Sequence, residues 1–139
     1  MKLEDQVCSL ELSVKLFTLG VKQNSLHRWQ HVLRDLWEPT SLKKKYIEEN
    51  NSYPENYSAF TVSELGEMLP TKFLWKNNDG TESCENVYLH IKKLPNSYQI
   101  WYADDDDKWF HWMEFSYVTE ADARAKMLVY LIENKIIEI

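Results

Sequence analysis

Four short segments between residues 73 and 117 constrain the fold of this 139-residue chain more than any other feature. Hydrophobic residues recur in them with a period of two, and β-branched and aromatic residues are frequent, as in strands. The segments are Phe73–Lys76, Asn86–Lys92, Tyr98–Ala103 and Trp109–Tyr117. Residues that favour turns separate them at 77–80, 95–96 and 104–107. The sequence therefore predicts an antiparallel meander, in which consecutive strands are neighbours.

An N-terminal helix is predicted up to about Leu19, because hydrophobic residues recur every three or four positions before it. These residues are Leu3, Val7, Leu10, Val14 and Phe17. Gly20 can adopt the left-handed conformation that often follows a helix, and Val21 can make the hydrophobic contact that accompanies such a cap. We therefore expect the helix to end just before Gly20.

Two further helices are predicted from their N-terminal caps. Thr61 and Glu64 have the spacing of a capping box, which predicts a short helix that runs to Leu69 before Pro70. Thr119 precedes a longer helix with acidic residues in its first turn. Its hydrophobic stripe consists of Ala121, Ala125, Leu128 and Ile132, with Leu131 beside it. We expect this last helix to pack closely on the sheet.

Residues 25–37 fit two kinds of secondary structure. The spacing of Leu26, Trp29, Leu33 and Leu36 is that of a helix, whereas His27, Trp29, His31 and Leu33 fit one face of a strand. Pro39 ends either element. Residues 40–58 are polar and rich in Asn, Glu and Tyr, so they are expected to form a long surface excursion.

Together these patterns predict one α+β domain that spans residues 1–139. Its expected architecture is an antiparallel meander sheet of three to five strands with helices packed on one face, and the C-terminal helix is central among them. The content of 44% hydrophobic and 27% charged residues is near the globular average and supports a chain that folds by itself.

Charge and hydropathy limit the possible partners and the compartment. The net charge of −6 makes nucleic acid an unlikely partner, because phosphate backbones are bound largely by Lys and Arg. Residues 1–6 carry acids and lack the hydrophobic stretch of a secretory signal, and no later stretch has membrane-spanning length. A cytoplasmic location without membrane association is expected. Cys8 and Cys84 are expected to be reduced thiols.

No residue pattern indicates a catalytic centre, a metal site or a cofactor, and none of these is predicted. The acidic run 104–107 lacks the alternating ligands, central Gly and terminal Glu of a calcium loop. His27, His31 and Asp35 would align on a helix, but no fourth zinc ligand is apparent. There is no nucleophile elbow and no glycine-rich phosphate loop.

Two alternative functions remain open at this point. Residues 12–37 resemble a helix-turn-helix framework, in which Leu16, Gly20, Val21, Leu26 and Trp29 would hold a recognition helix and Arg28 and Arg34 would contact phosphates. This is the DNA-binding alternative. An enzyme or small-molecule binder that uses a pocket lined by aromatic residues is the other.

Aromatic residues on both faces of the later strands indicate an interaction surface. The chain has 19 aromatic residues, and helices on one face of the sheet leave the other face open to a partner. The candidate surface residues are Tyr88, Trp101, Phe110 and Trp112, together with the hydrophobic C-terminal residues Ile136, Ile137 and Ile139. We expect the C-terminal residues to pack on the body of the protein or on a second subunit.

Three blocks of the sequence are similar to a group of small uncharacterised proteins of gut bacteria, often associated with prophages and other mobile elements. They are residues 8–12 with 19–23, residues 60–70 and residues 119–128. These blocks are helix caps and helix cores, so the resemblance implies a fold and no catalytic residue. It also implies a strand after Gly20, although His27-Arg28-Trp29 keeps only one residue of an aromatic pair at this position.

The function that these observations favour is non-catalytic. We expect a small cytoplasmic protein-interaction module of the mobile-element or accessory type. It is expected to bind a protein partner or to form a homo-oligomer. A homodimer formed through aromatic or C-terminal hydrophobic surface would satisfy this expectation without a further ligand.

Overall fold

The computed structural model describes residues 1–33, 36–41, 56–76, 82–104 and 114–139. Its helical elements are a 3-10 turn η1 (Leu3–Asp5) and the helices α1 (Leu10–Thr18), α3 (Val62–Met68) and α4 (Glu120–Glu133). Its strands are β1 (His27–Leu33), β2 (Leu36–Ser41), β3 (Asn56–Ser58), β4 (Lys72–Lys76), β5 (Glu82–Lys93), β6 (Tyr98–Ala103) and β7 (Phe115–Tyr117). The predicted α+β class is confirmed.

The predicted meander is the larger of two sheets. Its strands are antiparallel neighbours in the order β4-β5-β6-β7. The bounds of β6 are those predicted, whereas β5 begins at Glu82, four residues earlier than predicted. Residues 109–113 of the predicted fourth strand lie outside the described residues, and the described part of that strand is β7.

A second, smaller sheet that the sequence did not predict consists of β1, β2 and β3. Its order is β2-β1-β3, and both pairings are antiparallel. Residues 27–33 of the ambiguous segment are therefore a strand, and the second helix of the proposed helix-turn-helix is not formed there. The predicted excursion 40–58 is also wrong at both ends, because Thr40 and Ser41 belong to β2 and residues 56–58 form β3.

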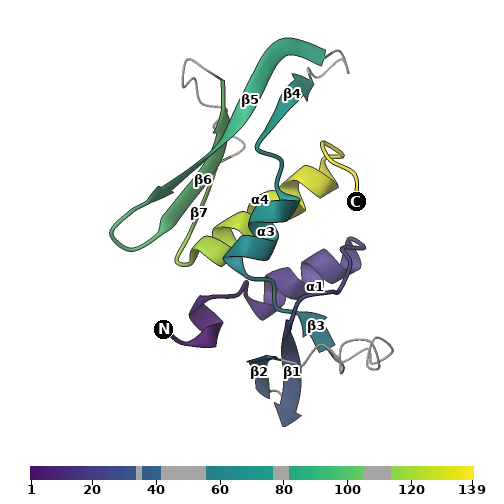
Figure 1. Cartoon of the computed structure of the whole chain (residues 1–139), viewed down its shortest axis with the longest axis vertical. Helices are drawn as coiled ribbons and strands as arrows, with labels where there is room; N and C mark the ends of the chain where they lie inside the picture. The colour runs from purple at the N-terminus through teal and green to yellow at the C-terminus, as the bar shows by residue number, and fades with distance from the viewer. Residues whose placement is uncertain (34–35, 42–55, 77–81, 105–113) are drawn as a thin grey trace.

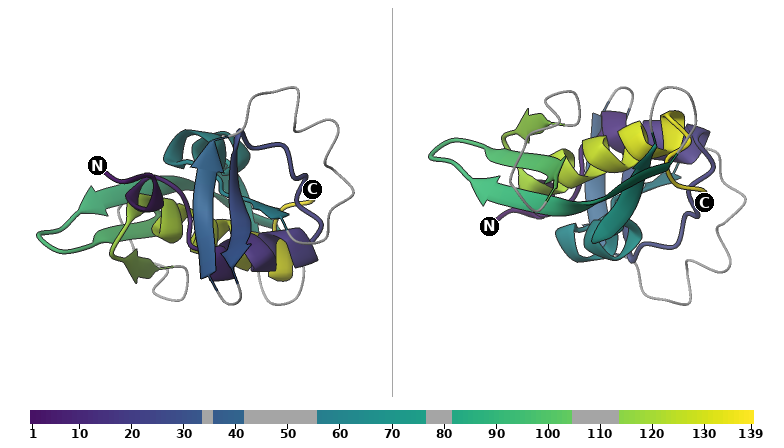
Figure 2. Two further views of the ribbon diagram at one scale, coloured as in Figure 1. Left: turned by 90° about the horizontal axis from the view of Figure 1, so that it is seen from below. Right: turned by 90° about the horizontal axis from the view of Figure 1, so that it is seen from above.

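The helices lie between the two sheets (Figure 1). α4 contacts β6 and β7 of the larger sheet, α1 contacts β3 of the smaller one, and both α1 and α3 contact α4. Figure 2 shows that the closed end of the β5–β6 hairpin projects past these helices. Helices thus cover one face of the four-stranded sheet, as predicted, but they also support a second sheet on their other side.

The N-terminal segment differs from its prediction at its start and agrees with it at its end. Leu3 lies in η1, and Val7 forms an isolated antiparallel bridge with Thr61, so α1 begins only at Leu10. At its end Gly20 has φ +88°, and the N–H groups of Gly20 and Val21 donate to the carbonyls of Phe17 and Leu16. This is the predicted left-handed cap.

Both predicted N-terminal caps are present. The Thr61 hydroxyl accepts from the Glu64 N–H, and the Thr119 hydroxyl accepts from the Asp122 N–H. Asp122 also accepts a hydrogen bond of 2.6 Å from the Ser9 N–H, which joins the start of α4 to the start of α1. The first turn of α4 is therefore fixed by its own cap and by a residue far away in sequence.

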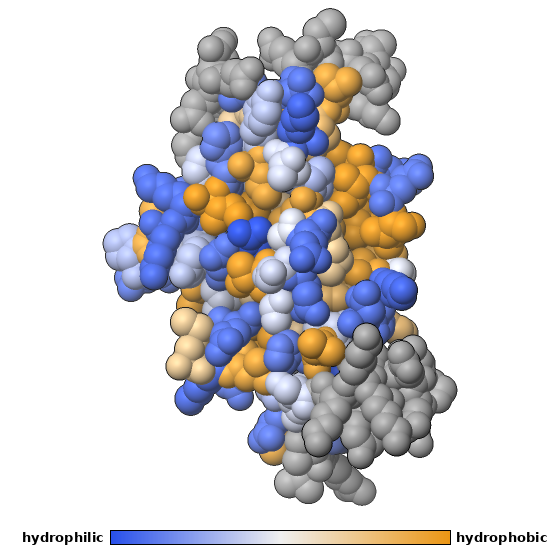
Figure 3. All heavy atoms as spheres, viewed as in Figure 1, coloured by the Kyte–Doolittle hydropathy of each residue, from blue (hydrophilic) through white to orange (hydrophobic). Residues whose placement is uncertain are grey.

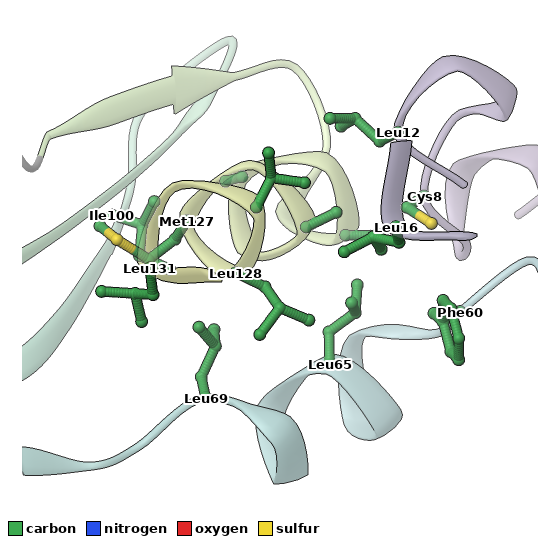
Figure 4. Packing of buried hydrophobic residues seen from close by; sticks show 14 of the residues in the cluster. Cys8, Leu12, Leu16, Phe60, Leu65, Leu69, Ile100, Met127, Leu128 and Leu131 are labelled. Atoms are coloured by element: carbon green, nitrogen blue, oxygen red, sulfur yellow. The ribbon is translucent and has the colours of Figure 1, made fainter. Parts of the chain in front are cut away.

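α4 is the centre of the main core. Ala121, Ala125, Leu128 and Leu131 of the predicted stripe are fully buried, and Ile132 is partly buried. The opposite side of the helix is buried too, at Ala123, Met127 and Val129. Figure 4 shows that α4 is surrounded by side chains from three other parts of the chain. They are Ile100 of β6, Leu12 and Leu16 of α1, and Leu65 of α3 with Leu69 at the end of that helix. The small alanines let these elements approach closely.

The end of α4 contains the one described non-glycine residue with a positive φ. Lys135 has φ 55°, and the N–H groups of Lys135 and Ile136 donate to the carbonyls of Ile132 and Leu131. This is the same cap as at Gly20, but here a residue with a Cβ occupies the left-handed position. The conformation costs free energy that glycine would not require.

We expect Lys135→Gly to raise the free energy of unfolding by about 0.5–1 kcal/mol, because glycine removes the left-handed strain. Lys135 is exposed, so little packing is lost. Urea denaturation followed by tryptophan fluorescence measures the change. Lys135→Ala is the matched control, since it removes the charge but keeps the Cβ. Equal stabilisation by both variants would contradict the explanation.

Candidate interaction surfaces

The outer face of the four-stranded sheet contains two of the predicted surface residues, Tyr88 and Trp101. Tyr88 is partly buried, but Trp101 is only 8% exposed and lies against the His90 ring at a centroid distance of 5.3 Å and an angle of 12°. The expectation that the Trp101 ring is open to a partner is therefore wrong. Phe110 and Trp112 lie outside the described residues.

The C-terminal residues divide into a packed pair and an exposed one. Ile136 and Ile137 are partly buried against the main core, as one of the two predicted arrangements requires. Ile139 is 64% exposed and lies beside Gly20, at the end of α1. In Figure 3, which has the view of Figure 1, hydrophobic residues gather on the side of the molecule where the C-terminus lies.

A row of four rings, not predicted from the sequence, crosses the smaller sheet and α1. Phe17 meets Tyr57 edge to face at 5.4 Å, Tyr57 lies 5.8 Å from Trp37, and Trp37 lies 5.1 Å from His31. Phe17 is 49% exposed, His31 is exposed, and Tyr57 and Trp37 are partly buried. We call these four residues the aromatic row. No residue of the row is fully buried.

Strand register brings the row together. Trp29 of β1 lies opposite Tyr57 of β3, and His31 lies opposite Trp37 of β2, so these side chains share one face of the sheet. Trp29 itself is buried in a small second core with Val7 and Ala59, and its indole N–H donates to the Cys8 carbonyl at 2.9 Å. Trp37 and Tyr57 of the row pack against this second core.

A buried polar network joins the smaller sheet to α3. One carboxylate oxygen, Glu64 Oε2, accepts from the Thr61 N–H at 2.8 Å, from the Thr61 hydroxyl at 2.9 Å and from the Ser25 hydroxyl at 3.0 Å. Ser25 is fully buried, and its oxygen accepts from the His27 N–H at 3.1 Å. The network holds the start of β1 against the start of α3.

Burial shifts the pKa values of several titratable groups that the structure describes. Burial raises the pKa of the Cys8 thiol from 9.0 to about 11, although its hydrogen bond with Ser13 acts in the opposite direction, so the reactive thiolate is suppressed. Burial also lowers the pKa of Arg28, whose guanidinium donates to the Gln23 carbonyl at 2.6 Å. The Tyr102 hydroxyl donates to the Pro70 carbonyl, and burial raises its pKa.

Described residues line two hollows that lack the aromatic lining of the predicted small-molecule pocket. One has a volume of about 480 Å³ and lies between residues 20–24, α3 and Ile139. The other, of about 560 Å³, lies between the N-terminal segment and the starts of α3 and α4, and Tyr98 is its one aromatic residue. Their linings mix acids, amides and aliphatic groups without a convergent reactive set.

Within the described ranges, no three His, Cys, Asp or Glu side chains are grouped so as to hold a metal ion. The zinc-ligand set considered from the sequence, His27, His31 and Asp35, includes one residue outside those ranges, Asp35. None of the described helices combines the length and the hydropathy that crossing a lipid bilayer requires. Comparison with protein families, curated proteins and solved structures gives no match for this chain.

Proposed function

We propose that this protein is a non-catalytic protein-interaction module that self-associates through the aromatic row. The observation that carries the proposal is the continuous contact of Phe17, Tyr57, Trp37 and His31 at the surface, with Phe17 half exposed. Aromatic side chains are enriched at protein interfaces because they bury a large area at a small cost in conformational entropy.

A second copy is the simplest occupant of the row. A two-fold axis would place the row against itself, so that rings pack on rings and no complementary surface elsewhere is needed. The resemblance to small proteins of mobile elements is consistent with an accessory role of this kind.

Sedimentation velocity over about 10–500 µM protein tests the proposal. We expect the wild-type chain to dimerise with increasing concentration, and Phe17→Ser to weaken dimerisation at least tenfold, as is usual when a large aromatic residue that contributes strongly to an interface is truncated. Val118→Ser is the matched control, because Val118 is 78% exposed but lies in the turn before α4. A monomer throughout the range, or equal weakening by both variants, would refute self-association through the row.

A further inference from the structure

The two described sheets have four edge strands, and these differ in their capacity to bind another strand. The edges are β2, β3, β4 and β7. β3 and β7 have three residues each, and β2 contains Pro39, which has no N–H to donate. β4 has five residues, Lys-Phe-Leu-Trp-Lys, and no proline. β4 is therefore the edge best suited to strand addition.

The ladder with β5 identifies the backbone groups that β4 directs outward. The Leu89 N–H donates to the Thr71 carbonyl at 3.0 Å, and the register pairs Phe73 with Val87. Along an antiparallel strand, every second residue bonds to a given neighbouring strand. Thr71 and Phe73 therefore bond to β5. The N–H and C=O groups of Lys72 and Leu74 point away from β5. No described strand lies on that outer side.

The side chains of Lys72 and Leu74 specify what a bound strand should carry. Both lie on the face of the sheet that the helices leave open, where Lys72 is exposed and Leu74 is 42% exposed. A strand added to β4 would place one residue beside each of them, two positions apart. A carboxylate beside the Lys72 ammonium and an aliphatic group beside Leu74 are the complementary choices.

A second copy of β4 does not supply this carboxylate. In a two-fold antiparallel pairing centred on residue 72, 73 or 74, the residue opposite Lys72 is Lys72, Leu74 or Lys76, respectively. None of these is acidic, and two of the three registers oppose like charges. We propose that β4 binds an extended acidic segment of a different protein by strand addition, with a carboxylate beside Lys72. This site is separate from the aromatic row and goes beyond self-association.

A short peptide that can bind in either direction provides the test. The probe is acetyl-Thr-Val-Thr-Glu-Thr-Val-Thr-amide, which has an aliphatic residue two positions from the glutamate on both sides. A second probe has lysine in place of the glutamate, and a third is the first probe methylated on alternate backbone nitrogens. We expect the glutamate probe to bind at least fivefold more tightly than the lysine probe, and methylation to abolish binding.

Charge reversal in the protein locates the site. Lys72→Glu should reverse the preference between the glutamate and lysine probes, whereas Lys92→Glu makes the same charge change at an exposed residue of the interior strand β5 and should leave the preference intact. Titration calorimetry measures both, and circular dichroism verifies folding. The proposal is overturned if neither probe binds at millimolar concentration, if the methylated probe still binds, or if both variants act alike. Phe17→Ser should not change probe binding, so this test is independent of self-association.

Discussion

Leu128→Ala is expected to lower the free energy of unfolding by about 2–5 kcal/mol. Leu128 is fully buried in the middle of α4, and Figure 4 shows its side chain pointing toward Leu65 and Leu69. Truncation removes three carbons from a fully buried site between α4 and α3, so the surroundings can close the resulting cavity only in part. Urea denaturation and thermal melting measure the loss, and the melting temperature should fall by about 10 °C.

Ile139→Ala is the matched control for this prediction. It also removes three carbons from an aliphatic side chain, but Ile139 is 64% exposed. Its effect should stay within about 0.5 kcal/mol. Comparable losses in the two variants would mean that α4 is not the centre of the core.

Glu64→Ala is expected to lower the free energy of unfolding by about 2–3 kcal/mol. The carboxylate accepts hydrogen bonds from the Thr61 N–H, the Thr61 hydroxyl and the hydroxyl of fully buried Ser25. Alanine would remove the side-chain acceptor of the Thr61 N–H in the capping box. It would also remove an acceptor for the buried Ser25 hydroxyl. Glu64→Gln keeps an acceptor oxygen without its charge, so it should cost less than alanine.

Glu67→Ala is the control for this prediction, because it makes the same change in helix propensity and net charge without touching the buried network. Glu67 lies three residues later in α3, is exposed, and has no described hydrogen-bond or ion-pair partner. Its replacement should change stability by no more than about 0.5 kcal/mol. If Glu64→Ala and Glu67→Ala were equally destabilising, the buried network would not be the reason for the effect of Glu64.

Local signals predicted the elements whose determinants lie within a few residues. The Thr61 and Glu64 capping box, the Thr119 cap and the left-handed Gly20 all occur as expected. β6 has its predicted bounds because Pro95-Asn96 lies just before it. Such caps and turns are governed by hydrogen bonds between near neighbours, which a single sequence displays directly.

The second sheet was missed because its determinants are distant in sequence. β3 has three residues within a polar stretch, and it becomes a strand by pairing with Arg28, Trp29 and Gln30. Val7 fitted the N-terminal helix by its spacing, but it pairs with Thr61 instead. No local pattern contains these partners, so tertiary pairing outweighed the helical period.

The sequence placed the candidate interaction residues on the late strands, whereas the aromatic row that we propose as an interface lies on the smaller sheet and α1. The alternation of side chains along β6 places Trp101 on the outer face of the sheet, as expected. The same alternation does not reveal that Trp101 is only 8% exposed. The row on the smaller sheet combines residues from α1, β1, β2 and β3, and its strand-like part was visible in the spacing of Trp29 and His31. That spacing identified a shared face without identifying Tyr57 or Phe17 as its neighbours.

The hydrogen bond between Ser9 and Asp122 bears on how the molecule is made. During synthesis the residues near position 9 leave the ribosome long before those near position 122, and until then α1 has no α4 to pack against. The two residues are 113 positions apart, so the chain must close a long loop before this hydrogen bond can form. The hydrophobic side of the nascent first helix must therefore remain unshielded, and vulnerable to aggregation, until α4 has been synthesised.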